Sequence, residues 1–136
     1  MFEVAIKESF AAAHLIRNYP GDCARLHGHT WFVEVGIYGE ELDDLGMLID
    51  FSKLKQIVRS YLKKLDHQLI NDLPEFREGE LNPTAENLAF YLYHQINQVI
   101  KKEWPDKKIA LGWVKVWESP TAWAIYRRGK NENISG

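Results

Sequence analysis

The chain has 136 residues, 46% of them hydrophobic, which is the length of one domain with its own core. Its 17 basic and 19 acidic side chains give a net charge of −2, so no general basic field argues for nucleic acid or anionic membranes as partners. A single cysteine, Cys23, excludes an internal disulfide framework and a four-cysteine zinc module. The lone cysteine, the charged N-terminal segment and the lack of a long apolar run favour a cytoplasmic protein.

Two strands are expected in the first third of the chain. Apolar and polar residues alternate from Phe2 onward, which predicts a strand over residues 2–14 with one buried face. A Pro-Gly-Asp turn signal lies in residues 15–26, so this segment is expected to be a loop. A second strand is predicted over residues 27–38, where apolar residues again occupy alternate positions.

Two helices are expected next. Apolar residues recur at helical spacing over residues 54–65, and Ser52 is the expected N-cap of this helix. Residues 66–83 show no regular pattern and predict a long connection. Thr84 is then expected to cap a second helix, with a glutamate in its first turn favoured by the helix dipole.

Two final strands, residues 108–118 and 122–127, complete a β-β-α-α-β-β order. This order predicts an α+β fold in which a four-stranded antiparallel sheet carries both helices on one face. Four strands leave two exposed edges, which subunit assembly would cover, so a homo-oligomer is expected. Residues 1–128 are predicted to form a single domain, followed by a polar C-terminal tail over residues 129–136.

Three histidines are candidates for a metal site. His27 and His29 lie two residues apart on a predicted strand, so their side chains point to the same face. His14 lies at the end of the preceding strand, which antiparallel pairing brings beside the start of the next. Three neutral imidazoles suit Zn²⁺ and leave a fourth position for water or substrate. The pair alone is more often two hydrogen-bonded core histidines, but the third histidine favours a zinc site.

A cupin-like metal site is a competing interpretation. Gly21, His27, His29 and Glu34 approximate the metal-binding motif of cupins. In cupins the glutamate follows a turn and lies on the next strand, whereas here residues 30–38 are predicted to be one uninterrupted strand. Glu34 then faces away from the histidines, and two long helices do not fit an all-β barrel. The cupin interpretation is therefore rejected.

Three further features each have more than one interpretation. Cys23, four residues before His27, is compatible with a fourth zinc ligand, an inert apolar side chain, or a base or nucleophile. Asp66 and His67 are either a favourable helix end or an acid/base pair in which the aspartate orients the histidine. Glu118 is either an ordinary strand-end residue or a carboxylate that receives two parallel N–H donors from a guanidine-like ring edge.

The chain resembles the 6-pyruvoyl-tetrahydropterin synthase family in the order and spacing of its segments CARLHGHTW, LIDF, LDHQLIND, NPTAEN and VWESPTAWAIYR. Within that family it is most similar to the bacterial 6-carboxy-tetrahydropterin synthases of the 7-deazaguanine (queuosine) pathway. The resemblance covers residues 2–128 and implies the tunnelling fold, with the same β-β-α-α-β-β order. In that fold, subunits associate through their sheets into a barrel, and two rings commonly stack into a hexamer, a dimer of trimers.

The resemblance also implies a reaction and the residues that perform it. The substrate would be 7,8-dihydroneopterin triphosphate, converted to 6-carboxy-5,6,7,8-tetrahydropterin with loss of acetaldehyde and triphosphate. The matching positions are zinc ligands at His14, His27 and His29, a catalytic base at Cys23, its catalytic partners at Asp66 and His67, and pterin-holding residues at Thr84 and Glu118.

The subfamily depends on fewer residues. The three-residue gap between Cys23 and His27 resembles the carboxy-forming enzymes, whereas pyruvoyl-forming relatives have a longer gap. A third group, which makes a dihydropterin aldol-cleavage product for folate synthesis, has a glutamate near the cysteine position, where Ala24 follows here. Pyruvoyl formation by triphosphate elimination, or a non-catalytic protein that binds a pterin or purine, stays open. The basic residues that are candidates to contact the triphosphate are Arg25, Lys53 and Arg127.

Overall fold

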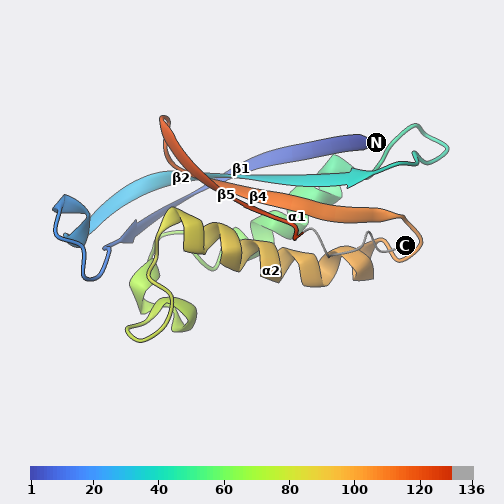
Figure 1. Cartoon of the computed structure of the whole chain (residues 1–136). Helices are drawn as coiled ribbons and strands as arrows, with labels where there is room; N and C mark the ends of the chain where they lie inside the picture. Colours follow the sequence, from blue (N-terminus) through green and yellow to red (C-terminus); the bar gives the residue numbers. More distant parts are fainter. Residues whose placement is uncertain (130–136) are drawn as a thin grey trace.

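The computed structural model describes residues 1–129, so the expected polar tail at residues 129–136 lies outside the described residues except for Gly129. Within the described part, the elements follow the expected order with one added strand (Figure 1). They are β1 (Phe2–His14), β2 (His27–Gly39), α1 (Phe51–Leu62), β3 (Gln68–Leu69), α2 (Ala85–Glu103), β4 (Ile109–Ser119) and β5 (Ala122–Arg127), with short 3-10 helices η1 (Asp22–Ala24), η2 (Ile70–Asp72) and η3 (Pro74–Phe76).

The sheet formed by residues 1–129 has five strands, in the order β3-β1-β2-β4-β5, and not the four that were expected. The added strand, β3, pairs in parallel with β1, Ala12 with Gln68 and Ala13 with Leu69. All other neighbouring strands are antiparallel. The prediction of a four-stranded, wholly antiparallel sheet is therefore wrong, because a two-residue strand is too short to show a period-two pattern.

Both helices lie along the same face of the sheet, as expected (Figure 1). α1 packs on β1, and α2 packs on β4 and β5. Alternate residues of the central strands face the helices, so their apolar side chains meet the apolar stripes of α1 and α2. The fully buried side chains of this core include Trp31, Val33, Val35, Ile37, Leu54, Val58, Leu88, Leu92, Ile96, Val114 and Val116. The α+β class with one helix-covered sheet face is confirmed.

The sequence predicted the N-cap residue correctly for one of the two helices. α1 begins at Phe51, and its N-cap is Asp50, whose carboxylate accepts a hydrogen bond from the Ser52 N–H at 2.8 Å. The expected cap at Ser52 is wrong, because aspartate two residues earlier is an equally good cap and starts the helix sooner. Thr84 caps α2 as expected, its hydroxyl accepting from the Asn87 N–H at 3.1 Å.

The connection at residues 66–83 contains short regular pieces that its sequence did not indicate. β3, η2 and η3 lie in this segment, and the fully buried side chains of Ile70 and Phe76 anchor it to the core. Neither α1 nor α2 has the length and apolar content that a crossing of the bilayer requires. The connection matters for function because it runs beside the end of β1, where the candidate residues gather.

Candidate metal centre

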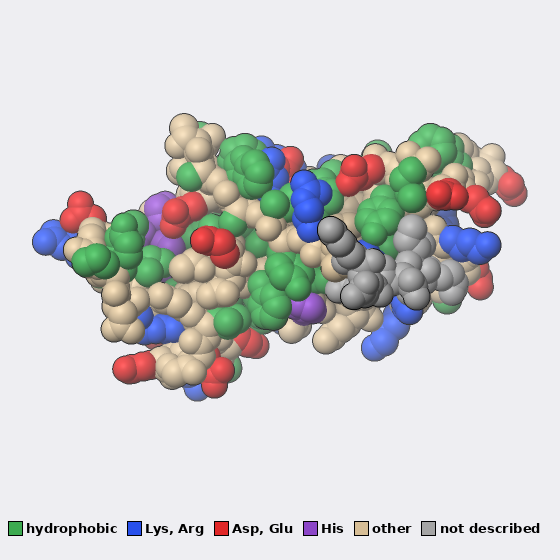
Figure 2. All heavy atoms as spheres, viewed as in Figure 1, with side chains coloured by type: hydrophobic (Ala, Val, Ile, Leu, Met, Phe, Trp, Pro, Cys, Tyr) green, Lys and Arg blue, Asp and Glu red, His purple; other side chains and the backbone are tan. Residues whose placement is uncertain are grey.

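Three histidine rings meet where β1 ends and β2 begins. His14 is paired directly with His27 in the β1–β2 ladder, and His29 lies opposite Ala12. The ring centroids of His14 and His27 are 4.5 Å apart, those of His27 and His29 4.7 Å, and those of His14 and His29 5.1 Å. Figure 2 shows histidine side chains in purple beside a carboxylate in red at the end of the molecule where β2 begins. The structure thus brings together the three candidate ligands.

Backbone carbonyls determine which nitrogen of two of these rings carries the proton. The Nδ1 of His14 lies 2.7 Å from the Pro83 carbonyl oxygen, and the Nδ1 of His27 lies 2.6 Å from that of Arg25. Because a carbonyl only accepts, each Nδ1 carries a proton, and each ring presents a lone pair at Nε2 when it is neutral. These two Nε2 atoms lie 2.9 Å apart, so two lone pairs face one another. This arrangement is unfavourable without a cation between them.

Burial favours the neutral form of two of the three histidines, His14 and His29, which is the form that a metal binds. Burial lowers the pKa of His14, against the opposing effect of the Pro83 hydrogen bond. Burial likewise lowers the pKa of His29, although the Glu118 carboxylate acts in the opposite direction. Within the described part of the chain, the Nε2 of His29 is also a buried nitrogen without a hydrogen-bond partner. Neutral imidazoles with unpartnered nitrogens are the donors that zinc binds.

Glu118 completes the group from the end of β4. Its Oε1 lies 3.2 Å from the Nε2 of His14 and 3.5 Å from that of His29, and among the described residues this His29 nitrogen has no hydrogen-bond partner. All four donor atoms lie within 4.8 Å of one another. Zinc–nitrogen bonds of about 2.0–2.1 Å place tetrahedral ligand atoms about 3.4 Å apart, so the donor set fits a zinc ion. From the sequence, Glu118 was predicted to be either an ordinary strand-end residue or a pterin-binding carboxylate, and not a member of the histidine group.

Cys23 lies in η1, in the loop between β1 and β2, and is exposed. Its sulfur is not part of the donor group found among residues 1–129. The backbone fixes the position of the loop, because the Cys23 carbonyl accepts a hydrogen bond from the Ile16 N–H at 2.7 Å. The thiol is therefore exposed and lies outside the donor group of the described residues.

Asp66 and His67 form a hydrogen-bonded pair at the edge of β1. The Nδ1 of His67 lies 2.9 Å from Asp66 Oδ2, and Asp66 Oδ1 accepts the Ala11 N–H at 2.9 Å. The Ala11 N–H, followed by His67, holds the pKa of Asp66 below its usual range. His67 has a positive φ of 59°, which its own N–H stabilises by donating to the Ala11 carbonyl. A cleft of about 610 Å³ is lined by both His67 and His29.

The remaining candidates lie at different distances from the donor group. Thr84 caps α2 and directly follows Pro83, whose carbonyl orients His14. Lys53 pairs with Glu103 at 3.1 Å, at the far end of α2. A 19-residue helix is about 28 Å long, so Lys53 is remote from the histidines of the same chain. Among the three basic candidates, Arg25 lies two residues before His27, and its carbonyl accepts a hydrogen bond from the His27 ring.

Two asparagines that sequence analysis did not single out clamp the chain just after His14. The amide of Asn71 accepts from the Leu15 N–H and donates to the Leu15 carbonyl, both at 3.0 Å. Asn82 makes the same pair of bonds to Arg17, at 3.0 and 3.1 Å. Each amide thus replaces a neighbouring strand for one residue. The one sign in the sequence was that Asn71 lies in the segment LDHQLIND and Asn82 in NPTAEN, both of which match the family. An asparagine side chain does not by itself indicate that it binds the backbone of a distant residue.

Replacing Asn82 with alanine is expected to destabilise the fold by about 2 kcal/mol, because two backbone hydrogen bonds to Arg17 lose their partner. Urea unfolding followed by circular dichroism measures the change. Gln98→Ala, at an exposed position of α2, is the control and is expected to stay within about 0.5 kcal/mol of the parent. An equal, small effect of both substitutions would show that the Asn82 clamp contributes no stability.

Comparison with known proteins places these features in a family. A sequence model described as 6-pyruvoyl tetrahydropterin synthase matches residues 3–129. A 6-carboxy-5,6,7,8-tetrahydropterin synthase of Bacillus subtilis (strain 168) is 36% identical over 132 residues, covering 95% of this chain and 87% of that protein. A 6-pyruvoyl tetrahydrobiopterin synthase of Dictyostelium discoideum is 34% identical over 109 residues, covering 79% of this chain and 74% of that protein.

The fold agrees with the sequence match. The structure of Caenorhabditis elegans 6-pyruvoyl tetrahydropterin synthase is similar to this one with a TM-score of 0.80 and 26% sequence identity, covering 94% of this chain and 96% of that chain. The matched residues include both strands that carry the three histidines and the strand that carries Glu118. The chain belongs to the 6-pyruvoyl tetrahydropterin synthase family.

Proposed function

We propose that the chain is a zinc-dependent carbon–carbon lyase that converts 7,8-dihydroneopterin triphosphate and one water molecule to 6-carboxy-5,6,7,8-tetrahydropterin, acetaldehyde and triphosphate, a step of queuosine biosynthesis. The observation that carries the proposal is the convergence of the Nε2 atoms of His14 and His27, 2.9 Å apart, while the Nδ1 of each ring faces a backbone carbonyl. Similarity to the Bacillus subtilis 6-carboxy-5,6,7,8-tetrahydropterin synthase supports the choice of reaction.

In this proposal His14, His27 and His29 hold the zinc ion. Bound there, zinc supplies a Lewis acid that stabilises negative charge developing on the side-chain oxygens of the substrate. The chain contributes the geometry, because the carbonyls of Pro83 and Arg25 keep two of the three rings in the required tautomer.

Proton transfer is assigned to side chains outside the donor group. The thiolate of Cys23 takes a proton from a substrate carbon beside a side-chain oxygen, and its exposure leaves it accessible to the substrate. His67 moves protons elsewhere along the side chain through Nε2, because its Nδ1 is hydrogen-bonded to Asp66. Glu118 and Thr84 hold the pterin ring so that its side chain reaches the histidines.

Replacing Asp66 with asparagine is expected to lower kcat about 10²–10⁴-fold, because an amide no longer holds His67 in the required tautomer. Steady-state kinetics and zinc content measure the result, and Asp72→Asn, at an exposed position, is the control. The pKa of Asp66 is also lower in the folded chain than in the unfolded chain, so its carboxylate stabilises the fold at pH values above the unfolded-state pKa. This contribution is lost as the pH falls through the folded-state pKa. Unchanged kcat in the Asp66 variant would remove the pair from the mechanism.

The same proposal includes a homo-oligomer, a hexamer built as a dimer of trimeric rings. Within residues 1–129, β5 pairs only with β4, and β1 pairs with β3 only at Ala12 and Ala13, so both sheet edges have unpaired backbone groups. On the face away from the helices, Lys115 lies 4.0 Å from the ring centre of Trp123. Joining the edges of successive sheets would enclose this face. Light scattering tests the assembly, and a hexamer has six times the 15.8 kDa mass of the chain.

Incubation with 7,8-dihydroneopterin triphosphate tests the reaction. Mass spectrometry detects the pterin product, and a coupled assay detects acetaldehyde. The carboxy product with one equivalent of acetaldehyde is the expected result. A pyruvoyl product without acetaldehyde would assign the second candidate, pyruvoyl formation, which the similarity to the Dictyostelium discoideum enzyme favours. No product at full zinc occupancy would assign a non-catalytic pterin- or purine-binding protein.

A further inference from the structure

The three histidine rings of the metal centre differ in what orients them. The Nδ1 of His14 faces the Pro83 carbonyl at 2.7 Å, and that of His27 faces the Arg25 carbonyl at 2.6 Å. For His29 there is no such partner, because among residues 1–129 no hydrogen bond reaches either nitrogen of its ring. Metal-binding histidines are almost always held through their second nitrogen, so the His29 ring needs a different kind of contact to orient it.

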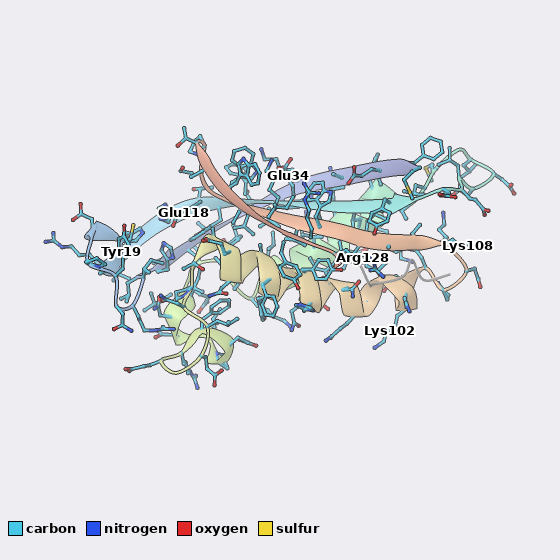
Figure 3. All side chains as sticks on the ribbon, in the orientation of Figure 1. Tyr19, Glu34, Lys102, Lys108, Glu118 and Arg128 are labelled. Carbon is cyan, nitrogen blue, oxygen red and sulfur yellow. The ribbon has the colours of Figure 1, made fainter. Side chains whose placement is uncertain are left out.

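The His29 ring also has room to turn away from the other two. Its side chain is 23% exposed, and it lines the cleft of about 610 Å³ that His67 lines as well. This end of the sheet is marked in Figure 3 by Glu118, near the loop that carries Tyr19. A ring that turned into the cleft would take the third nitrogen away from the metal centre.

Trp31 is the residue that contacts the His29 ring from the core. It lies two residues further along β2, on the same face of the strand. Its ring centre is 5.2 Å from that of His29, with the ring planes at 77°, and 4.9 Å from that of His14, with the planes at 83°. Both pairs have the edge-to-face arrangement that aromatic rings favour. One indole thus contacts two of the three ligand rings.

Trp31 is itself held firmly enough to orient other rings. Its side chain is fully buried, and its indole N–H donates to the Ala12 carbonyl at 3.2 Å. Phe10, its partner in the β1–β2 ladder, stacks on it with the ring planes 5° apart and the centroids 6.0 Å apart. Ala12 is the residue of β1 that pairs with His29. The hydrogen bond therefore joins the indole to the backbone directly opposite His29.

We propose that Trp31 is a positioning residue of the metal centre: its indole holds the His29 ring, and supports the His14 ring, so that their nitrogens reach one metal ion. For His29 this ring contact takes the place of the backbone hydrogen bond that orients His14 and His27. The inference rests on the proposed function for the presence of the metal, and it does not depend on the reaction.

The test measures metal binding without substrate. Zinc affinity is measured by competition with a chromophoric chelator, under conditions in which circular dichroism shows each variant to be folded. Trp31→Leu removes both ring contacts and is expected to bind zinc about 10–100-fold more weakly than the parent chain. The visible absorption of the cobalt-loaded protein is the second readout, since tetrahedral cobalt absorbs much more strongly than six-coordinate cobalt. Weaker bands are expected in Trp31→Leu, because water takes the place of a His29 ring that is no longer held.

Two further variants separate positioning from stability. Trp31→Phe keeps an aromatic face against His29, so its zinc affinity is expected to lie between those of the parent chain and Trp31→Leu. Ile37→Ala is the matched control, because Ile37 is fully buried on the same face of β2, eight residues or about 26 Å from His29. It is expected to lower the Tm and to leave the zinc affinity and the cobalt spectrum at the parent values.

Parental zinc affinity in Trp31→Leu would overturn the inference. An equal loss of zinc affinity in Ile37→Ala would overturn it too, because affinity would then follow the stability of the core. If Trp31→Leu does not fold, Trp31→Phe decides the question, and parental affinity with an unaltered cobalt spectrum in that variant overturns the positioning role.

The lyase assay on the same preparations keeps the two claims apart. Turnover by a parent chain whose zinc affinity does not depend on Trp31 overturns the inference while the proposed function stands. Zinc affinity that depends on Trp31, without turnover, supports the inference and overturns the assignment of the reaction. A parent chain that binds no zinc overturns both.

Discussion

Replacing Cys23 with alanine is expected to lower kcat about 10²–10⁴-fold while the zinc content stays at that of the parent protein. The loss has the size that a general base contributes, and the thiol is the proposed base. Zinc is retained because the sulfur does not belong to the donor group found among residues 1–129. Steady-state kinetics gives the rate, and mass spectrometry of the metal gives the zinc-to-chain ratio.

Two further variants make this result specific. Cys23→Ser keeps the size of the side chain but not its acidity, so it is expected to be nearly as slow as the alanine variant. Ala24→Ser, in the same 3-10 helix, is the control and is expected to keep the parent rate. Loss of zinc from Cys23→Ala would make the thiol a ligand, and full activity would remove it from the reaction.

Replacing His29 with alanine is expected to abolish stoichiometric zinc binding and turnover together. Losing a ligand should weaken zinc binding by more than the 10–100-fold that losing an outer hydrogen-bond partner causes. Among residues 1–129, the Nε2 of His29 is buried without a hydrogen-bond partner, so truncating the ring removes no hydrogen bond at that nitrogen. Zinc is expected to raise the Tm of the parent protein and to leave that of the variant unchanged, since only a bound ion stabilises the native state.

The control for this experiment is His94→Ala. His94 lies on α2, where its ring contacts Phe90 and Tyr126, and it is outside the donor group of the described residues. It is expected to keep both the zinc content and the rise in Tm. A His29 variant that still binds one zinc per chain would show that the ion is held elsewhere.

The sequence was sufficient for the parts of the site that depend on strand periodicity. Alternation over residues 2–14 and 27–38 determined which faces the side chains occupy, and the loop between the strands determined that they are antiparallel. The contact of His14 with His27 and the outward direction of Glu34 both follow from these two facts. Thr84 was located as a cap for a similar reason, because capping is a local property.

Features that depend on strand order and on the connection at residues 66–83 were not predictable in this way. Nothing in the pattern of β4 says that it lies beside β2, and this neighbourhood is what brings Glu118 to the histidines. β3 is too short to carry a pattern, and the clamps at Asn71 and Asn82 use side-chain amides in place of strand partners. Such contacts join residues more than fifty positions apart.

By itself, then, the sequence determined the class of the fold, the family resemblance and the residue types of a metal centre, because these depend on local spacing and on chemistry that a side chain carries wherever it lies. Only the tertiary structure decided the tautomers of His14 and His27, the nearness of Glu118 to both His14 and His29, and the pairing of Asp66 with the edge of β1. Each of these is a hydrogen bond or close contact whose partner is set by how the strands and the connection pack, and packing has no local signature.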